Sequence, residues 1–129
     1  MAVVGKKTLE KWIKTFNKEY GLSHKNKECL DYFMKIREIA NFDIYDDSIL
    51  VTLVFGDAWG EKILSVVTYY ILPEHRNYKN FIKIQNRIDE LAKNNNVRYI
   101  YQGSHLAPKL NSVLMKRGYQ VGVMKKEII

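Results

Sequence analysis

Four stretches of the sequence repeat apolar residues at the three- and four-residue spacing of an amphipathic helix. They cover residues 8–20, 27–40, 79–94 and 106–117. Gly21 and Gly118 follow the first and last of them, in the position where glycine commonly ends a helix. Asn26 precedes the second and is predicted to be its N-cap. We therefore expect four helices, each with one apolar face.

Between these stretches the apolar pattern changes to runs of β-branched and aromatic residues of strand length. The runs cover residues 49–55, 63–72 and 97–102, and residues 119–129 are predicted to add one or two final strands. The glycine-flanked segment 56–60 predicts a hairpin turn between the first two runs. The expected order is ααββαβαβ, which indicates one α/β domain over residues 1–129 with a mixed central sheet flanked by helices.

The composition excludes several classes of protein. With 47% hydrophobic residues, the chain has enough apolar surface to form a core, so disorder of the whole chain is not expected. No apolar run approaches the roughly 18 residues that a membrane span needs. Cys29 is the only cysteine, so it forms no disulfide within the chain, and we expect a cytoplasmic location.

The charge of the chain is concentrated in its second half. The formal net charge is +7, residues 1–64 are neutral, and residues 65–129 carry the whole excess. A basic half predicts an anionic partner, which charge alone leaves open as nucleic acid, a phosphate-bearing cofactor or an acidic protein.

The segment from Pro73 to Phe81 is the strongest candidate for an anion site. It joins the strand 63–72 to the helix 79–94, and a loop that opens directly onto a helix presents free backbone N–H groups at the positive end of the helix dipole. Arg76, Lys79 and Lys83 are expected to surround this site. A solvated basic helix face, with no ligand, explains the same composition.

Two sequence motifs in this arrangement resemble those of the GCN5-related N-acetyltransferases. TYYILPEHR resembles the family's strand followed by V-x-P-x-x-R, and VLMKRGYQ resembles its L-Y-x-K-x-G-F, with Leu114, Lys116, Gly118 and Tyr119 in register. The resemblance implies the GNAT fold and acetyl-CoA as cofactor. The cofactor-binding residues it implies are Ile71, Arg76, Asn77, Tyr78, Lys79, Asn80 and Phe81.

The sequence departs from the family pattern at three kinds of position. Lys79 and Phe81 stand where the family's pyrophosphate turn has small residues, so we expect the Phe81 side chain to obstruct close approach of a phosphate. Leu114 stands where the family has its general-acid tyrosine, and Ala107 where it commonly has an asparagine. These departures favour a chain that keeps the fold and has lost the activity.

Candidate catalytic residues are few. Tyr70 lies on the central strand, while His75 and His105 lie near the ends of adjacent strands. Each histidine is better explained as a surface loop residue. His24, His75, His105 and Cys29 lack the spacing of a metal site, so no metal is expected.

Three functions remain open from the sequence. The first is an acyl-CoA-dependent N-acyltransferase, whose coenzyme A would account for the basic half. The second is an inactive GNAT-like binding or structural protein, because small basic Lys- and Asn-rich proteins of this kind resemble phage-encoded virion or host-takeover components; a virion location would then replace the cytoplasm. The third is a nucleic-acid binder that uses Tyr99 and Tyr101, although core packing is the expected role of both tyrosines. Its basic residues would be Arg98, Lys109, Lys116 and Arg117.

Overall fold

A computed structural model describes residues 3–102 and 109–119, which form helices on both sides of a mixed sheet. The helices are α1 (Lys6–Glu19), α2 (Asn26–Ile36), α3 (Tyr78–Asn94) and α4 (Lys109–Lys116). The strands are β1 (Asn41–Ile44), β2 (Ser48–Gly56), β3 (Lys62–Ile71) and β4 (Tyr99–Tyr101), and the 3-10 turns are η1 (Ser23–Lys25) and η2 (Pro73–His75). The predicted α/β class is confirmed.

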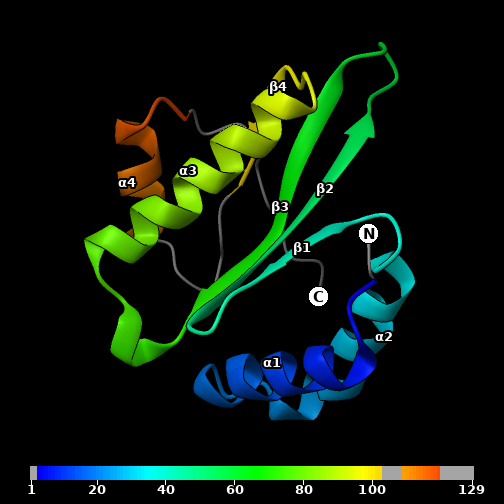
Figure 1. Cartoon of the computed structure of the whole chain (residues 1–129), viewed down its shortest axis with the longest axis vertical. Helices are drawn as coiled ribbons and strands as arrows, with labels where there is room; N and C mark the ends of the chain where they lie inside the picture. The colour runs from blue at the N-terminus through cyan, green and yellow to red at the C-terminus, as the bar shows by residue number, and fades with distance from the viewer. Residues whose placement is uncertain (1–2, 103–108, 120–129) are drawn as a thin grey trace, which may run out of the picture.

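The four strands lie side by side in the order of the chain (Figure 1). β1 pairs antiparallel with β2, and β2 antiparallel with β3, whereas β4 runs parallel to β3. The parallel pair is possible because α3 carries the chain back across the sheet between β3 and β4. The predicted hairpin of residues 49–55 and 63–72 is confirmed as β2 and β3.

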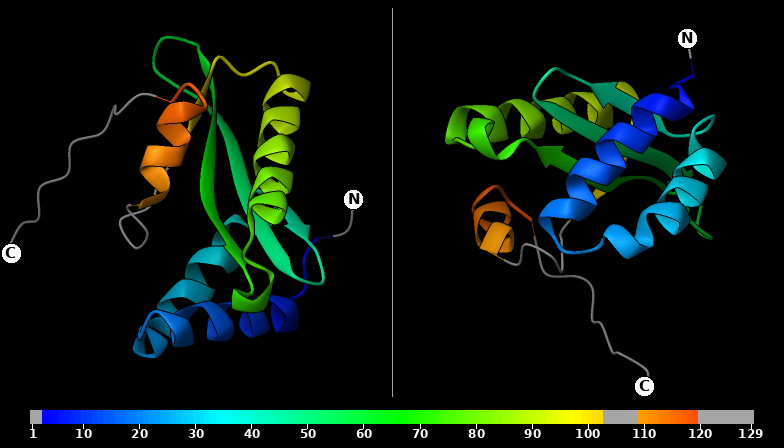
Figure 2. Two further views of the ribbon diagram at one scale, coloured as in Figure 1. Left: turned by 90° about the vertical axis from the view of Figure 1, so that its left-hand side faces the viewer. Right: turned by 90° about the horizontal axis from the view of Figure 1, so that it is seen from below.

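Two apolar clusters pack on opposite faces of this sheet. Figure 2 shows α3 on one side of the sheet and α1 and α2 on the other. On one face Ile84 and Ile88 of α3 pack against Leu64 of β3, and all three side chains are fully buried. On the other face Trp12 of α1 and Ile36 of α2 pack against Val51 of β2. The α3 face and the face covered by α1 and α2 are therefore separate halves of the core.

An extra residue in β3 changes which of its side chains reach each face. Val51 pairs with Thr68 and Thr52 pairs with Val66, so Val67 has no partner in the register. Val67 packs in the cluster of α1 and α2, and Thr68 lines a cavity on the same side. Two consecutive side chains on one face identify a β-bulge. Beyond it Tyr69 faces α3 and Tyr70 faces α1.

Three sequence predictions about elements need correction. The helix predicted over 27–40 ends at Ile36, and the chain turns before entering β1, a strand that was not predicted. Asn26 is not the N-cap of α2 but its first residue, and its Oδ1 accepts a hydrogen bond from Asn17 Nδ2 at 2.9 Å. Of the helix predicted over 106–117, residues 106–108 lie outside the described residues, as do residues 120–129 of the predicted final strands.

The core role predicted for Tyr99 and Tyr101 is wrong. Their side chains remain 46% and 51% exposed, while Ile100 between them packs against the cluster on the α3 face. Alternation along β4 puts the tyrosines on the opposite face from Ile100. The expectation assumed that both faces of this strand are covered.

Candidate functional site

The turn between β3 and α3 presents backbone N–H groups to solvent. β3 ends at Ile71, η2 follows, and α3 begins at Tyr78, with Asn77 as its N-cap. Among the described residues, the N–H groups of Tyr78 and Lys79 have no acceptor, as expected in the first turn of a helix. Both residues are exposed. Two N–H donors at the positive end of a 17-residue helix suit a negatively charged group.

Part of the predicted anion site is already hydrogen-bonded within the chain. The Asn80 N–H donates to Asn77 Oδ1 at 2.9 Å, and the Asn80 side-chain Nδ2 donates to the carbonyl of His75 at 2.6 Å. The N–H of Phe81 donates to the carbonyl of Asn77 at 3.0 Å. The first two residues of α3, Tyr78 and Lys79, therefore keep N–H groups that have no acceptor among the described residues.

The sequence led us to expect that the charge of Arg76 faces the anion site. The structure shows instead that the guanidinium is paired within the chain. Its Nη2 donates to Glu19 Oε1 at 2.6 Å and its Nη1 to Glu19 Oε2 at 2.5 Å. Its Nε donates to the carbonyl of Ile71 at 2.8 Å. The guanidinium is thus bound to the last turn of α1 and the end of β3.

Of the other two predicted cations, Lys79 lies at the turn and has no hydrogen-bond or ion-pair partner among the described residues. Lys83 lies with Nζ 4.3 Å from the centre of the Tyr45 ring, a cation–π contact on the side of α3 that borders β1. Lys79 is exposed in the first turn of α3 and borders the same side. The predicted cluster of three cations is therefore reduced to Lys79.

Phe81 packs against the sheet. Its ring centre lies 6.5 Å from that of Tyr69, with the planes tilted, and its side chain is half-buried. The ring consequently contributes to the packing of α3, whereas the N–H groups of Tyr78 and Lys79 lie one turn earlier. The obstruction of a phosphate by the Phe81 side chain stays a prediction.

Of the candidate catalytic residues, the structure describes Tyr70 and His75, and these two side chains share no hydrogen bond. Tyr70 is 4% exposed and donates its hydroxyl to Glu19 Oε1 at 2.6 Å, and its burial raises its pKa to about 12, with the Glu19 hydrogen bond as a second cause. His75 is exposed, and its imidazole has no hydrogen-bond partner within residues 3–102 and 109–119. His105 and Ala107 lie outside the described residues. Leu114, at the acid tyrosine's position, is buried.

β3 has an edge that β4 covers only in part. β4 pairs with residues 63–65 of β3, so within the described residues no strand pairs with this edge from Val66 to Ile71. The uncovered stretch begins at the bulge and leads directly to the β3–α3 turn. An extended ligand with polar groups along its length can hydrogen-bond to such an edge while its negative end lies at the turn.

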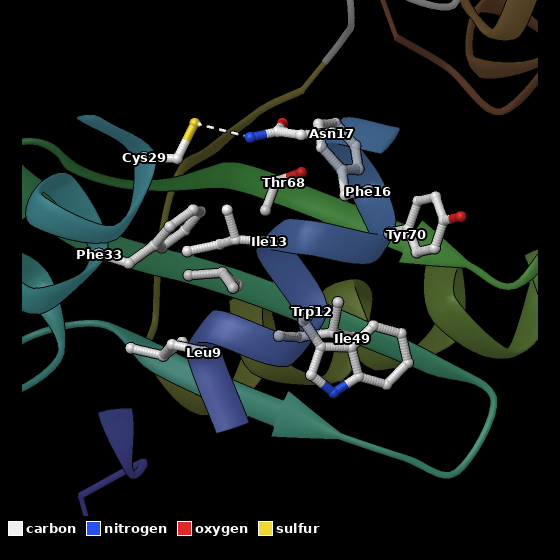
Figure 3. A pocket seen from close by; sticks show the side chains of 11 residues that line it. Leu9, Trp12, Ile13, Phe16, Asn17, Cys29, Phe33, Ile49, Thr68 and Tyr70 are labelled. Atoms are coloured by element: carbon white, nitrogen blue, oxygen red, sulfur yellow. Dashed lines mark hydrogen bonds between the residues drawn. The ribbon is translucent and has the colours of Figure 1, made fainter. Parts of the chain in front are cut away.

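Two of the hollows in the described part of the chain lie beneath α1 and α2 and along α3. An apolar cavity of about 50 Å³ lies between the sheet and the helices α1 and α2 (Figure 3). Its lining includes Asn17, whose Nδ2 donates to Cys29 Sγ at 3.5 Å, while the Tyr70 hydroxyl points away from it. This cavity is too small for a cofactor, since ligand pockets occupy roughly 300–1,000 Å³. An open groove of about 490 Å³ runs along α3 beside Tyr45, Lys79 and Lys83.

The described residues contain neither a candidate metal site nor a candidate membrane span. No group of three or more His, Cys, Asp or Glu side chains within residues 3–102 and 109–119 could hold a metal ion. None of the helices in that part of the chain is long and apolar enough to cross a membrane.

No protein-family model matches the sequence, and no curated protein matches it either. Solved structures do match, over nearly the whole of both chains. A GCN5-related N-acetyltransferase from Ralstonia eutropha JMP134 superposes with a TM-score of 0.73 at 10% identity, covering 96% of this chain and 92% of its own. A ribosomal-protein-alanine N-acetyltransferase from Brucella melitensis biovar Abortus 2308 gives 0.65 at 10% identity, with 99% and 96% coverage. A predicted acetyltransferase from Clostridium acetobutylicum with acetyl-CoA gives 0.70 at 16% identity, with 99% and 94% coverage.

The fold is that of the acetyltransferases. More narrowly, it is the GCN5-related N-acetyltransferase (GNAT) fold, which the resemblance of the two sequence motifs implied. At 8–16% identity these similarities establish the fold alone.

One residue of the site was not found by sequence reasoning. Glu19 binds both Arg76 and Tyr70, yet it precedes Arg76 by 57 residues in the chain. Its only local signal is a carboxylate in the last turn of a helix, which is unfavourable there because the helix dipole is negative at that end. That disfavoured position is a weak hint that the carboxylate has a partner elsewhere.

Proposed function

We propose that the chain binds an acyl-coenzyme A at the β3–α3 turn and acts as an N-acyltransferase. The observation that carries the proposal is the pair of free N–H groups of Tyr78 and Lys79, at the end of a partly uncovered β3 edge in a GNAT fold. The phosphates of coenzyme A would lie on these N–H groups and near the ammonium of Lys79. Its pantetheine arm would follow the β3 edge between Val66 and Ile71.

The residues of the turn fit the phosphate end of this cofactor. Two backbone donors and one exposed lysine supply positive potential, and Arg76 contributes to the fold of the turn through Ile71 and Glu19. When bound, coenzyme A would supply the thioester whose carbonyl carbon an amine attacks, so that a C–N bond forms and the C–S bond breaks. Tyr70 of β3 is hydrogen-bonded to Glu19 and its pKa is raised, so in this proposal the protons are exchanged with solvent.

A charge reversal at Lys79 tests the binding site. Calorimetric titration with coenzyme A is expected to give saturable binding to the wild-type chain, and Lys79→Glu should weaken it about tenfold because it puts a negative charge beside the phosphates. Lys93→Glu is the matched control, since Lys93 is also exposed on α3 but lies in its last turn. Equal weakening by both variants would show a nonspecific charge effect and would contradict the site.

The exposure of Tyr99 and Tyr101 supports a second candidate function, binding of single-stranded nucleic acid. Both rings lie on one face of β4, and the guanidinium of Arg98 lies 5.5 Å from the centre of the Tyr99 ring. Bases stack on exposed aromatic rings, and arginine beside them adds charge. Acidic-protein binding rests on the charge of residues 65–129 alone, and a non-catalytic virion or host-takeover role rests on the sequence resemblance alone.

Salt dependence tests the second function. We expect binding of a single-stranded oligonucleotide to weaken steeply as salt rises, and Tyr99→Ala with Tyr101→Ala to weaken it further. Tyr32→Ala is the control, because Tyr32 is 48% exposed on α2. Absence of binding at low salt would exclude this function.

A further inference from the structure

The loop that carries the proposed cofactor site is attached to α1 through Arg76. The Arg76 guanidinium reaches in two directions: Nε donates to the carbonyl of Ile71 at 2.8 Å, and both terminal nitrogens donate to the Glu19 carboxylate. Ile71 is the last residue of β3, and Glu19 is the last residue of α1. One side chain therefore connects a strand end, a loop and a helix end.

Glu19 is itself held by the core. Its Oε1 also accepts the Tyr70 hydroxyl at 2.6 Å, and the Arg76 guanidinium lies 5.1 Å from the centre of the Tyr70 ring. That ring packs edge-on against Trp12 and Phe16 of α1, at centroid distances of 6.3 and 5.4 Å. The carboxylate has two donors and a buried ring beside it, so its position is set by packing as well as by charge.

We propose that Glu19 is a positioning residue, which acts through Arg76 to fix the β3–α3 turn in the shape that presents the Tyr78 and Lys79 N–H groups. The identity of the ligand rests on the proposed function, while the fixing of the turn does not. Arg76 is then a brace of the turn and not a ligand of phosphate. Its three guanidinium nitrogens already have acceptors in the chain.

The geometry of η2 explains how the brace acts on the turn. The N–H of His75 donates to the carbonyl of Leu72 at 2.8 Å, and that of Arg76 donates to the carbonyl of Pro73 at 3.3 Å. The hydrogen bond from Arg76 Nε to Ile71 closes the same short segment from its other side. Without Glu19, the guanidinium loses the partner that directs it toward Ile71, and the segment from Leu72 to Asn77 gains conformational freedom.

The variant Glu19→Gln distinguishes two opposite roles of Glu19 in coenzyme A binding. If Glu19 held Arg76 away from the cofactor, Glu19→Gln would release the guanidinium and tighten binding. If Glu19 positions the turn, the same variant should raise the dissociation constant for coenzyme A about tenfold, the size of effect that residues without ligand contact can have. Glu90→Gln is the matched control, because it removes an ion pair to Arg87 on the exposed side of α3.

A second variant tests the same chain of contacts. Arg76→Lys keeps the positive charge but loses the forked contact with Glu19 and the Nε donor to Ile71, so it should weaken binding about as much as Glu19→Gln. Because the two residues act as one unit, the double variant should bind no more weakly than either single variant. Additive losses would overturn the proposal.

Hydrogen exchange in the absence of ligand separates this inference from the proposed function. We expect Glu19→Gln, and not Glu90→Gln, to accelerate exchange of the His75 and Arg76 amides. A wild-type chain that fails to bind coenzyme A would refute the proposed function, and the exchange rates would still decide the role of Glu19. Unchanged exchange in Glu19→Gln, or tighter coenzyme A binding by it, would overturn the inference.

Discussion

Arg76 shows how a residue in a motif can serve the fold. The sequence places it where the GNAT turn has its arginine, but its guanidinium lies against Glu19, Ile71 and Tyr70. The free donors at the turn are backbone N–H groups, whose presence depends on where α3 begins and not on side-chain identity. The backbone donors therefore remain although Lys79 and Phe81 stand where the family has small residues.

The Glu19–Arg76 pair gives stability a pH dependence. The hydrogen bond from Arg76 lowers the Glu19 pKa below its ordinary value of 4.5, against an opposing effect of burial. A lowered folded-state pKa means that the stabilisation is complete above about pH 4.5 and is lost as the pH falls through the folded value.

We expect the free energy of unfolding of the wild-type chain to exceed that of Glu19→Gln by about 1 kcal/mol at pH 7, and this difference to vanish at acidic pH. Urea denaturation at both pH values measures it. A difference that persists unchanged well below pH 4.5 would show that Glu19 stabilises the fold without its charge.

The burial of a residue can be predicted from the sequence where the apolar face of its own helix or strand decides it. Ile84 and Ile88 are buried as the helical pattern indicates. Tyr99 and Tyr101 were assigned to the core because β4 was assumed to be covered on both faces, and the structure leaves them exposed. Coverage of a face depends on which elements pack there, which local sequence does not specify.

At the level of elements, α3 shows how the sequence fixes the start of a helix at the site. Asn77 has extended backbone angles, and its side chain accepts a hydrogen bond from the Asn80 N–H. This cap satisfies the donor of the third helical position and leaves the first two free. The cap therefore decides which N–H groups are available to a ligand.

Asn77→Ala should lower the free energy of unfolding by about 1 kcal/mol, the usual value of an N-cap. Thermal or urea denaturation measures the change. Asn86→Ala, on the exposed side of the same helix, should have little effect. If the two variants are equally stable, the Asn77 hydrogen bond contributes nothing to α3.

The elements with long regular patterns were predicted well, and the short ones were not. α1, α3 and the β2–β3 hairpin agree with the sequence to within one or two residues at nearly every end. β1 was missed because only Phe42 and Ile44 alternate within its four residues. α2 was extended to residue 40 because no glycine or proline marks the turn, where the N–H groups of Ile39 and Ala40 both donate to the carbonyl of Ile36.

At the level of the whole molecule, the fold brings α1 to the turn that the sequence identified. The location of the turn could be predicted because β3 and α3 are consecutive. The contribution of Glu19 could not, because it depends on α1 packing across the face of the sheet that holds Tyr70. The GNAT fold itself is established by superposition on solved structures.

Binding of coenzyme A to the wild-type chain tests the central claim most directly. Calorimetric titration should give a saturable single-site isotherm whose affinity falls as salt rises, because the phosphates carry the interaction. Pantetheine, which has the same arm without the phosphates, should bind much more weakly. Absence of heat and of thermal stabilisation at millimolar coenzyme A would contradict the claim and leave a GNAT fold without its cofactor.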